Sequence, residues 1–174
     1  MNLLDYRSGV IADLRSMLPA KVSVDSHAGA LGIADVRAFA LPTGAVRVAV
    51  LSGSDKTDTD PRLAVRVSAF VLTKNAREGG KDELNLVLSS TIFGIAATQK
   101  LGSVRPVQVG YQNMYTPELR DEGIALAAIT WTANVDLDPV AGPELAEFLR
   151  IYFTTTPTPA VAGVGGIDHV NVRE

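Results

Sequence analysis

The segment from Gly123 to Val135 constrains the fold more than any other part of the sequence. Its side chains alternate as in a β-strand, yet both alternating sets are largely apolar. One set contains Ile124, Leu126 and Ala128, whereas the other includes Trp131, the only tryptophan of the chain. A strand that is apolar on both faces needs cover on both faces. We therefore predict that this segment lies in the middle of a β-sheet.

Two other segments, 2–18 and 81–100, carry apolar residues at helical spacing. Asn2 is a suitable N-cap for the first helix, and Pro19 ends it because proline cannot continue a helix. Gly94, inside the second helix, costs about 1 kcal/mol relative to alanine, which suggests close packing at that position. We predict a helix in each segment.

Four further segments have the composition of strands. They are 22–24, 45–51, 62–74 and 104–111. The second and third predict an antiparallel hairpin, and the polar residues from Gly53 to Pro61 predict an exposed loop between them. Pro106 favours an edge strand or the beginning of a strand. The state of 33–41 stays open, and 143–153 could be a short helix or partly a strand.

This order of elements predicts an α+β domain with a mostly antiparallel sheet and helices packed on one face. We place the domain at residues 1–138. Residues 139–174 then form a C-terminal extension, and the run TTTPTPAVAGVGG from Thr154 offers little to bury. We expect this extension to be a flexible tail or an arm that contacts a neighbour.

Composition excludes several classes of function. The 174 residues include no cysteine, which rules out disulfides, thiolate catalysis and cysteine-bound metals. The first residues lack the pattern of a secretory signal, and no apolar run approaches the roughly 18 residues that span a bilayer. The net charge is −3 without a lysine–arginine cluster, so tight DNA binding is not expected. We expect a soluble protein without a membrane partner.

The sequence contains no persuasive catalytic or metal-binding pattern. Asp25, Ser26 and His27 have the residue types of a catalytic triad, but adjacent residues in a loop point in different directions. The aspartates between 53 and 61 lack the glycine and glutamate spacing of a calcium-binding EF-hand loop. We therefore expect a protein that is not an enzyme, with no catalytic residue, no metal site and no cofactor.

Tyr111 and Tyr115 lie near a predicted turn and are candidate interface anchors, because aromatic residues concentrate at the centres of protein contacts. The alternative is that both pack over the edge of the domain's own sheet. The sequence alone leaves these two possibilities open.

The order of features resembles the tail-terminator, or tail-completion, proteins of tailed phages, especially the family in Mu-like prophages. The helix end IADLRSMLP is similar to the family's first helix, and the strand–hairpin–helix series from Ala45 to Ile95 follows the family's order. The closing segment is similar to the pattern N-x-Y-[ST]-x-x-L…G-[IV]-A-x-x-x-[IV]-x-[WF]. The matching residues are Asn113, Tyr115, Thr116, Leu119, Gly123, Ile124, Ala125, Ile129 and Trp131. The resemblance covers about residues 1–137.

The resemblance implies a structural virion protein that forms a ring, commonly a hexamer, on the last ring of the tail tube. Such a ring stops tube growth and provides the surface on which a neck or head-completion protein docks. The implied location is the tail–neck junction, after assembly in the host cytoplasm. The tail sheath is a possible further partner. DNA would cross the lumen without tight binding, in keeping with the acidic charge of the chain.

A closed ring needs two different patches on each subunit. Our candidates are the loops 53–61 and 113–122, together with Tyr111 and the C-terminal arm. The candidate contact residues are Asp55, Lys56, Asp58, Asp60, Tyr111, Asn113, Tyr115, Pro117 and Arg120. The alternative functions are a head-completion or neck protein, a tail-tube subunit, or a small non-catalytic ligand-binding domain.

Overall fold

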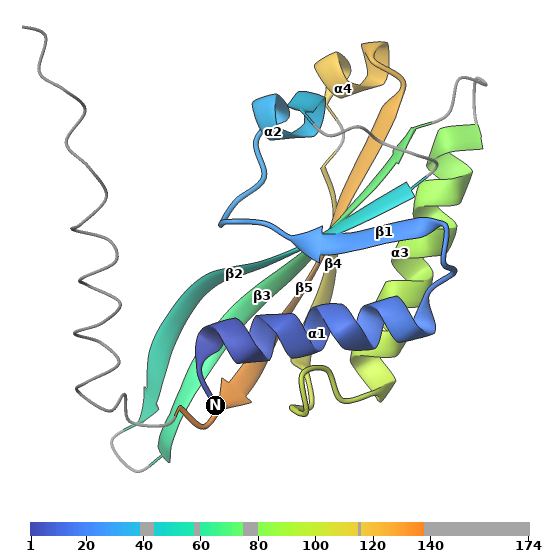
Figure 1. Cartoon of the computed structure of the whole chain (residues 1–174). Helices are drawn as coiled ribbons and strands as arrows, with labels where there is room; N and C mark the ends of the chain where they lie inside the picture. The colour runs from blue at the N-terminus through green and yellow to red at the C-terminus, as the bar shows by residue number, and fades with distance from the viewer. Residues whose placement is uncertain (39–43, 58–59, 75–79, 115, 138–174) are drawn as a thin grey trace, which may run out of the picture. The chain divides into compact units, whose positions relative to one another are not determined.

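The computed structural model describes residues 1–38, 44–57, 60–74, 80–114 and 116–137 (Figure 1). Met1–Asp138 forms one compact unit, which has the bounds of the predicted domain. The predicted C-terminal extension at 139–174, with its possible helix at 143–153, lies outside the described residues. The arm therefore stays a prediction.

In the described part of the chain, five strands form one sheet in the order β1-β2-β3-β5-β4. The strands are β1 (Val22–Ser26), β2 (Gly44–Thr57), β3 (Asp60–Lys74), β4 (Val107–Asn113) and β5 (Ile124–Val135). β1 is parallel to β2, and the other neighbouring pairs are antiparallel. The structure thus confirms the predicted α+β class with a mostly antiparallel sheet.

β5 lies between β3 and β4, so the prediction of a strand inside the sheet is confirmed. Its residues from Ile124 to Ile129 are all buried, because both faces of the sheet are covered at this end. β4 is the outer neighbour and begins one residue after Pro106. The position of this proline before an edge strand agrees with its lack of a backbone N–H.

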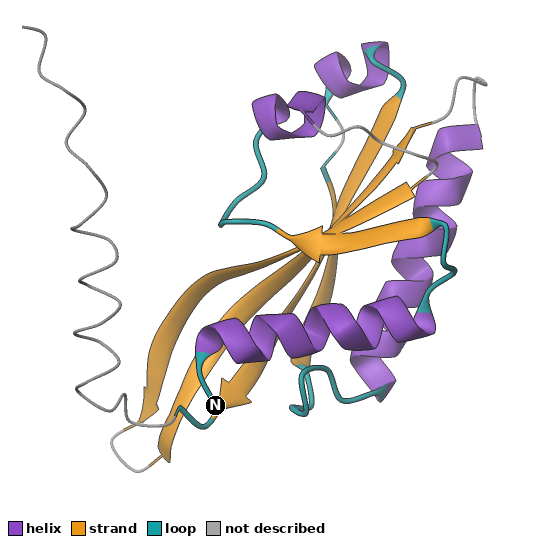
Figure 2. Cartoon of the chain, in the orientation of Figure 1, coloured by secondary structure: helices purple, strands orange, loops and turns teal. Residues whose placement is uncertain are grey.

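Two long helices, α1 (Leu3–Met17) and α3 (Gly80–Thr98), contribute to a single core on one face of the sheet (Figure 2). Asn2 caps α1 as predicted: its side chain accepts a hydrogen bond from the Asp5 N–H, and the Asp5 carboxylate accepts one from the Asn2 N–H. The helix packs its buried stripe against the strands.

The centre of this core is a polar contact between α1 and β5. The Trp131 Nε1–H donates to the Tyr6 hydroxyl over 3.2 Å, and both side chains are almost fully buried. Burial raises the pKa of Tyr6 to about 12, while the hydrogen bond from Trp131 acts in the opposite direction. The contact satisfies the only hydrogen-bond donor of the indole.

Two short helices contribute to a second cluster on the opposite face. They are α2 (Ile33–Ala38) and α4 (Pro117–Asp121), and they lie at the same end of the sheet (Figure 1). Val36 of α2 and Leu119 of α4 are buried with Phe70 of β3 in this cluster. The sequence left α2 open and placed α4 in a loop, so these two helices are additions to the predicted fold.

The predicted loop from Gly53 to Pro61 is wrong. β2 continues to Thr57 and β3 starts at Asp60, with pairs such as Asp55 opposite Leu63. Register shifts beyond Val50 and Asp55 let the ladder continue. The polar composition suggested a loop, but a hairpin that extends beyond the core needs only backbone pairing and tolerates polar side chains.

Candidate interaction surfaces

The first group of predicted contact residues lies at the far end of the β2–β3 hairpin. Asp55 and Lys56 belong to β2, and Asp60 is the first residue of β3. Asp58 lies outside the described residues. The structure therefore places Asp55, Lys56 and Asp60 on strands, where the sequence had predicted a loop.

The second group lies on and after β4. Tyr111 and Asn113 are exposed residues of β4, Pro117 is the first residue of α4, and Arg120 belongs to the same helix. Tyr115 lies outside the described residues. Tyr111 is 45% exposed, so a large part of its side chain is accessible at the edge of the sheet.

The two groups lie at opposite ends of the sheet. Val135 of β5 pairs with Leu63 beside the hairpin end, and Ala127 of β5 pairs with Asn113. Those two pairs are eight positions apart along β5, which corresponds to roughly 26 Å. The structure does not bring the two predicted groups together into one site.

A groove between α3 and β4 joins Tyr111 and Asn113 to residues that the sequence did not single out. Its volume is about 240 Å³, and α3 contributes Asp82, Asn85 and Leu86 to it. The buried Asn85 amide donates to the carbonyls of two neighbouring strands, over 3.0 Å and 3.2 Å. This side chain therefore fixes the start of α3 to the sheet and holds one wall of the groove in place.

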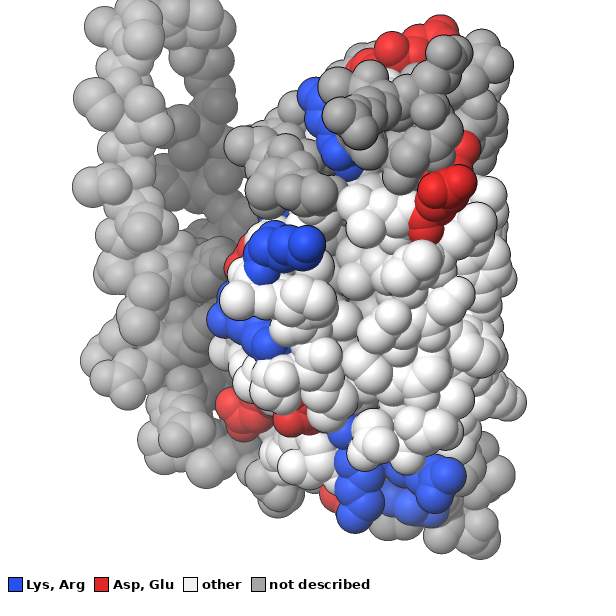
Figure 3. Space-filling model, turned by 90° about the vertical axis from the view of Figure 1, so that its right-hand side faces the viewer, with Lys and Arg blue, Asp and Glu red and all other residues white. Residues whose placement is uncertain are grey.

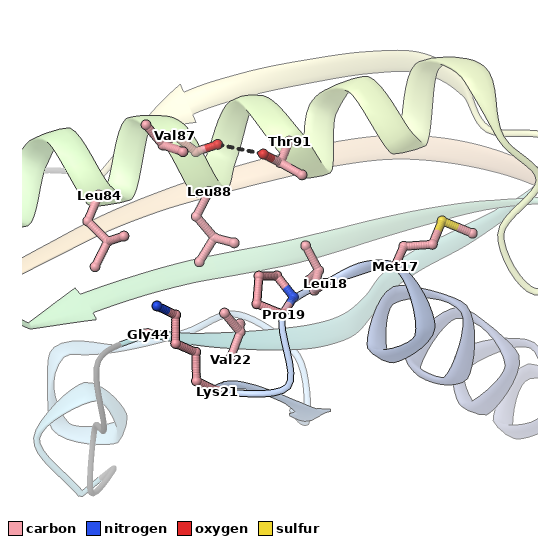
Figure 4. A pocket seen from close by; sticks show the side chains of 10 residues that line it. All are labelled: Met17, Leu18, Pro19, Lys21, Val22, Gly44, Leu84, Val87, Leu88 and Thr91. Carbon is pink, nitrogen blue, oxygen red and sulfur yellow. Dashed lines mark hydrogen bonds between the residues drawn. The ribbon is translucent and has the colours of Figure 1, made fainter.

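A second groove, of about 370 Å³, lies between the end of α1, the beginning of β1 and α3 (Figure 4). Its lining is almost wholly apolar, and Lys21 is the one charged residue among the described residues that line it. The Thr91 hydroxyl donates to the Val87 carbonyl of its own helix over 2.9 Å. The groove suits an apolar group and offers few polar contacts to orient it.

The outer face of α3 is a surface that sequence reasoning missed. From Leu84 to Gln99 the chain has no charged residue, and Leu86, Val87 and Phe93 are 52%, 65% and 37% exposed. Figure 3 shows this part of the molecule as a broad area without charges. The available signal was the absence of charge on every side of the predicted helix, since a helix with one solvated face usually carries charges there.

Charged residues lie at both ends of this face. Asp82 and Glu83 are exposed in the first turn of α3, and Lys100 and Arg105 are exposed just after its end. This order, acidic at the start and basic at the end, is the one that the helix dipole favours.

The two edges of the sheet differ. The His27 N–H donates to the Val48 carbonyl of β2. Successive residues of a strand point their backbone groups to alternate sides, so the Val24 carbonyl of β1, three residues earlier, points away from β2. Arg15 of α1 covers that edge, because its Nε donates to the Val24 carbonyl over 2.8 Å. No described strand pairs with the outer edge of β4. One edge is therefore protected by a side chain, whereas the other pairs with none of the described strands.

Asp25 and His27 do not form the core of a catalytic triad. The Asp25 carboxylate accepts hydrogen bonds from Arg15 at 2.8 Å and from Arg47 at 3.1 Å. The His27 ring instead lies 3.8 Å from the Asp35 carboxylate. The two side chains turn towards different neighbours, as expected for adjacent residues.

The described residues include no group of three or more histidine, aspartate or glutamate side chains arranged to hold a metal ion. None of the described helices is both long enough and apolar enough to cross a membrane.

Comparison with known proteins gives little further information. No protein-family model matches the chain, and no curated protein matches it. Among solved structures, one whose protein has no descriptive name is similar over 78% of this chain and 94% of its own, with 9% identity and a TM-score of 0.43. A likeness at that level carries no argument about function.

Proposed function

We propose that this protein is a structural subunit of a phage tail. It forms a closed ring on the end of the tail tube, stops tube growth and offers a docking surface to a neck or head-completion protein. The proposal starts from the resemblance in sequence to tail-terminator proteins. The structural observation that supports it is the placement of the two predicted contact groups at opposite ends of the sheet.

This placement suits a ring because a closed ring is built from heterologous contacts, in which two different patches of each subunit meet. The end of the β2–β3 hairpin is polar, with Ser52 and Ser54 exposed. The β4 edge pairs with no described strand and carries the exposed side chains of Val107 and Tyr111. One subunit thus presents two chemically different surfaces, so that one copy can dock onto the next without using the same patch twice.

The partners in this proposal are other copies of the chain, six in the commonest form of such rings, and the tail-tube protein on one face. A neck or head-completion protein would dock on the other face, and the sheath in a contractile tail. The ring would lie at the tail–neck junction of the virion after assembly in the host cytoplasm. DNA would cross its lumen without tight binding, because exposed carboxylates repel phosphate.

One observation favours a second candidate function. The apolar groove of about 370 Å³ beside α1 has the volume of a small-ligand site. A ligand-binding domain would use this groove and would be a compact monomer or dimer. Two results together would favour this function over the ring. The chain would bind a small apolar ligand to saturation and never form rings, and Val87→Lys would abolish the binding.

The ring is tested by light scattering and negative-stain imaging of the purified protein, alone and mixed with its tail-tube protein. We expect rings of about six subunits that do not elongate. Open-ended tubes would instead indicate a tube subunit. Failure to form rings even in the presence of the tube would overturn the proposal.

A point variant sharpens this test. Tyr111→Ala should weaken ring assembly by about 1–3 kcal/mol while the subunit stays folded, because truncation of an aromatic anchor removes contact area. Leu4→Ala is the matched control, since Leu4 is 61% exposed on α1, away from β4. If both variants assemble equally well, the β4 edge does not contribute to the ring.

A further inference from the structure

The exposed stripe on α3 has an unusual order of side-chain sizes. Leu86, Ser90, Phe93 and Ala97 follow one another at spacings of four, three and four residues, so they lie along one side of the helix. None of the four is buried. Large and small residues alternate along the stripe, which leaves a recess beside each projecting side chain.

Gly94 widens one of these recesses. Apart from its chain neighbours and the adjacent backbone of its own helix, a Cβ added at Gly94 would meet no atom within 4 Å. The close packing that the sequence suggested at this glycine is therefore not made within the described part of the chain. A surface of another molecule could approach the helix backbone closely here.

We propose that the outer face of α3 docks against the same face of a second copy, with the two helices antiparallel about a twofold axis. The axis passes beside the midpoint between Thr91 and Ile92. Leu86 then lies opposite Ala97 of the second copy, and Ser90 lies opposite Phe93. Each large side chain meets a small one, which is the condition for two helix surfaces to interlock.

The charges at the ends of α3 fit the same register. With the axis at that midpoint, Glu83 lies opposite Lys100 of the second copy, and Lys100 lies opposite its Glu83. Asp82 and Arg105 add one further charge of the same sign at each end. A single register therefore matches size in the middle of the helix and charge at both ends.

This self-complementarity is why a second copy is the occupant that we favour. In a twofold contact one stripe supplies both halves of each pairing, as α3 does. The helix has 19 residues and is therefore about 28 Å long. Because one helix face is smaller than a standard interface, we expect a reversible dimer that depends on protein concentration.

The contact does not depend on the proposed ring. A ring joins two different patches, whereas the α3 contact joins one patch to itself. It could link two subunits, or two complete rings face to face.

Charge reversal tests the register. Glu83→Lys and Lys100→Glu should each raise the dimer dissociation constant about tenfold, because each turns two attractive pairs into repulsive ones. The double variant should return it to the original value, since both pairs are restored with opposite polarity. An equimolar mixture of the two single variants should also dimerise. Sedimentation velocity over a range of concentrations measures all four, and Arg7→Glu on α1 is the control.

The double variant also separates docking from stability. Each reversal opposes the α3 dipole, so the double variant should unfold more easily than either single variant. A purely structural role of the two residues would therefore make the double variant the worst of the series. Recovered dimerisation together with lower thermal stability supports the contact, and dimerisation that stays weak overturns it.

Leu86→Glu gives a second test that leaves both helix ends unchanged. Leu86 is exposed, so the variant should fold normally and remain monomeric at concentrations where the original chain dimerises. If the face binds the tail tube instead, the double charge reversal would weaken tube binding without recovery, because the tube protein is unchanged. That outcome, or a Leu86→Glu protein that dimerises normally, would overturn the proposal. Loss of rings with dimers intact would overturn the ring alone.

Discussion

Removal of the Tyr6 hydroxyl has an effect on stability whose size can be predicted from the structure. In Tyr6→Phe the ring remains, but the Nε1–H of Trp131 loses its acceptor. Trp131 is 1% exposed, so the donor cannot turn to solvent without movement of the core. A buried donor without a partner costs about 1–3 kcal/mol, and we expect the free energy of unfolding to fall by that amount at pH 7.

The pH dependence gives this prediction a second, independent part. The pKa of Tyr6 rises from 10.0 to about 12 in the folded chain, so its stabilising contribution is complete below pH 10 and is lost as pH rises towards 12. At pH 11 the unfolded chain has released most of this proton and the folded chain has not, which lowers stability by about 1.4 kcal/mol. Phenylalanine has no hydroxyl to ionise, so the stability of Tyr6→Phe does not fall in this way. The difference in stability between the two proteins should therefore shrink by that amount between pH 8 and pH 11.

Urea unfolding followed by fluorescence measures both parts, because Trp131 is the only tryptophan and lies at the site. Tyr111→Phe is the matched control, since the same change at an exposed tyrosine should leave the stability at pH 7 unchanged. A Tyr6→Phe protein as stable as the original at pH 7 would refute the inferred cost of the unpaired indole. A difference that stays constant up to pH 11 would refute the raised pKa.

Three further predictions concern single side chains. Asn85→Ala should lower the free energy of unfolding by about 1–3 kcal/mol in urea titrations, because two buried carbonyls lose a donor; Ser90→Ala on the exposed side of the same helix should change it by less than about 0.5 kcal/mol. Gly102→Ala should cost roughly 2–4 kcal/mol in the same assay, because its φ is +58° and a Cβ would lie 2.8 Å from Tyr6. Arg15→Ala should change stability by less than about 1 kcal/mol but uncover the β1 edge, so light scattering should show increased aggregation.

The main elements could be predicted from the sequence because their periodicity is long enough to show. α1, α3 and β5 all have at least twelve residues, and their apolar spacing distinguishes a helix from a strand. α2 and α4 have six and five residues, which is less than two helical turns and too short for a period to appear. Their formation depends on contacts with the sheet rather than on their own sequence.

The hairpin shows why composition misleads at the boundary of an element. Serine, aspartate and threonine favour turns, so the residues around Asp55 suggested a loop. The backbone pairing of β2 with β3 overrides that preference. Such pairing depends on both segments together, so the composition of one segment alone does not predict it. The same limit hid the parallel pairing of β1 with β2.

The candidate surfaces were predicted only in part. Tyr111 and Asn113 do lie at an exposed edge, and their role in a contact stays a prediction. The outer face of α3 was missed because its apolar residues were assigned to a core-facing helix. Only the tertiary structure shows that Leu86 and Phe93 are exposed.

The contact between Tyr6 and Trp131 also bears on the order in which the chain can fold. These residues are 125 positions apart in sequence. Asp13 of α1 likewise accepts a hydrogen bond from the Gly102 N–H, 89 positions away. α1 also packs against β1 and β2, which follow it closely in the sequence, whereas its contacts with Trp131 and Gly102 need β5 and the segment after α3. Contacts of such long range slow folding. The docking of α1 can therefore begin with the neighbouring strands, and it is completed only when the distant segments that hold Gly102 and Trp131 join the same core.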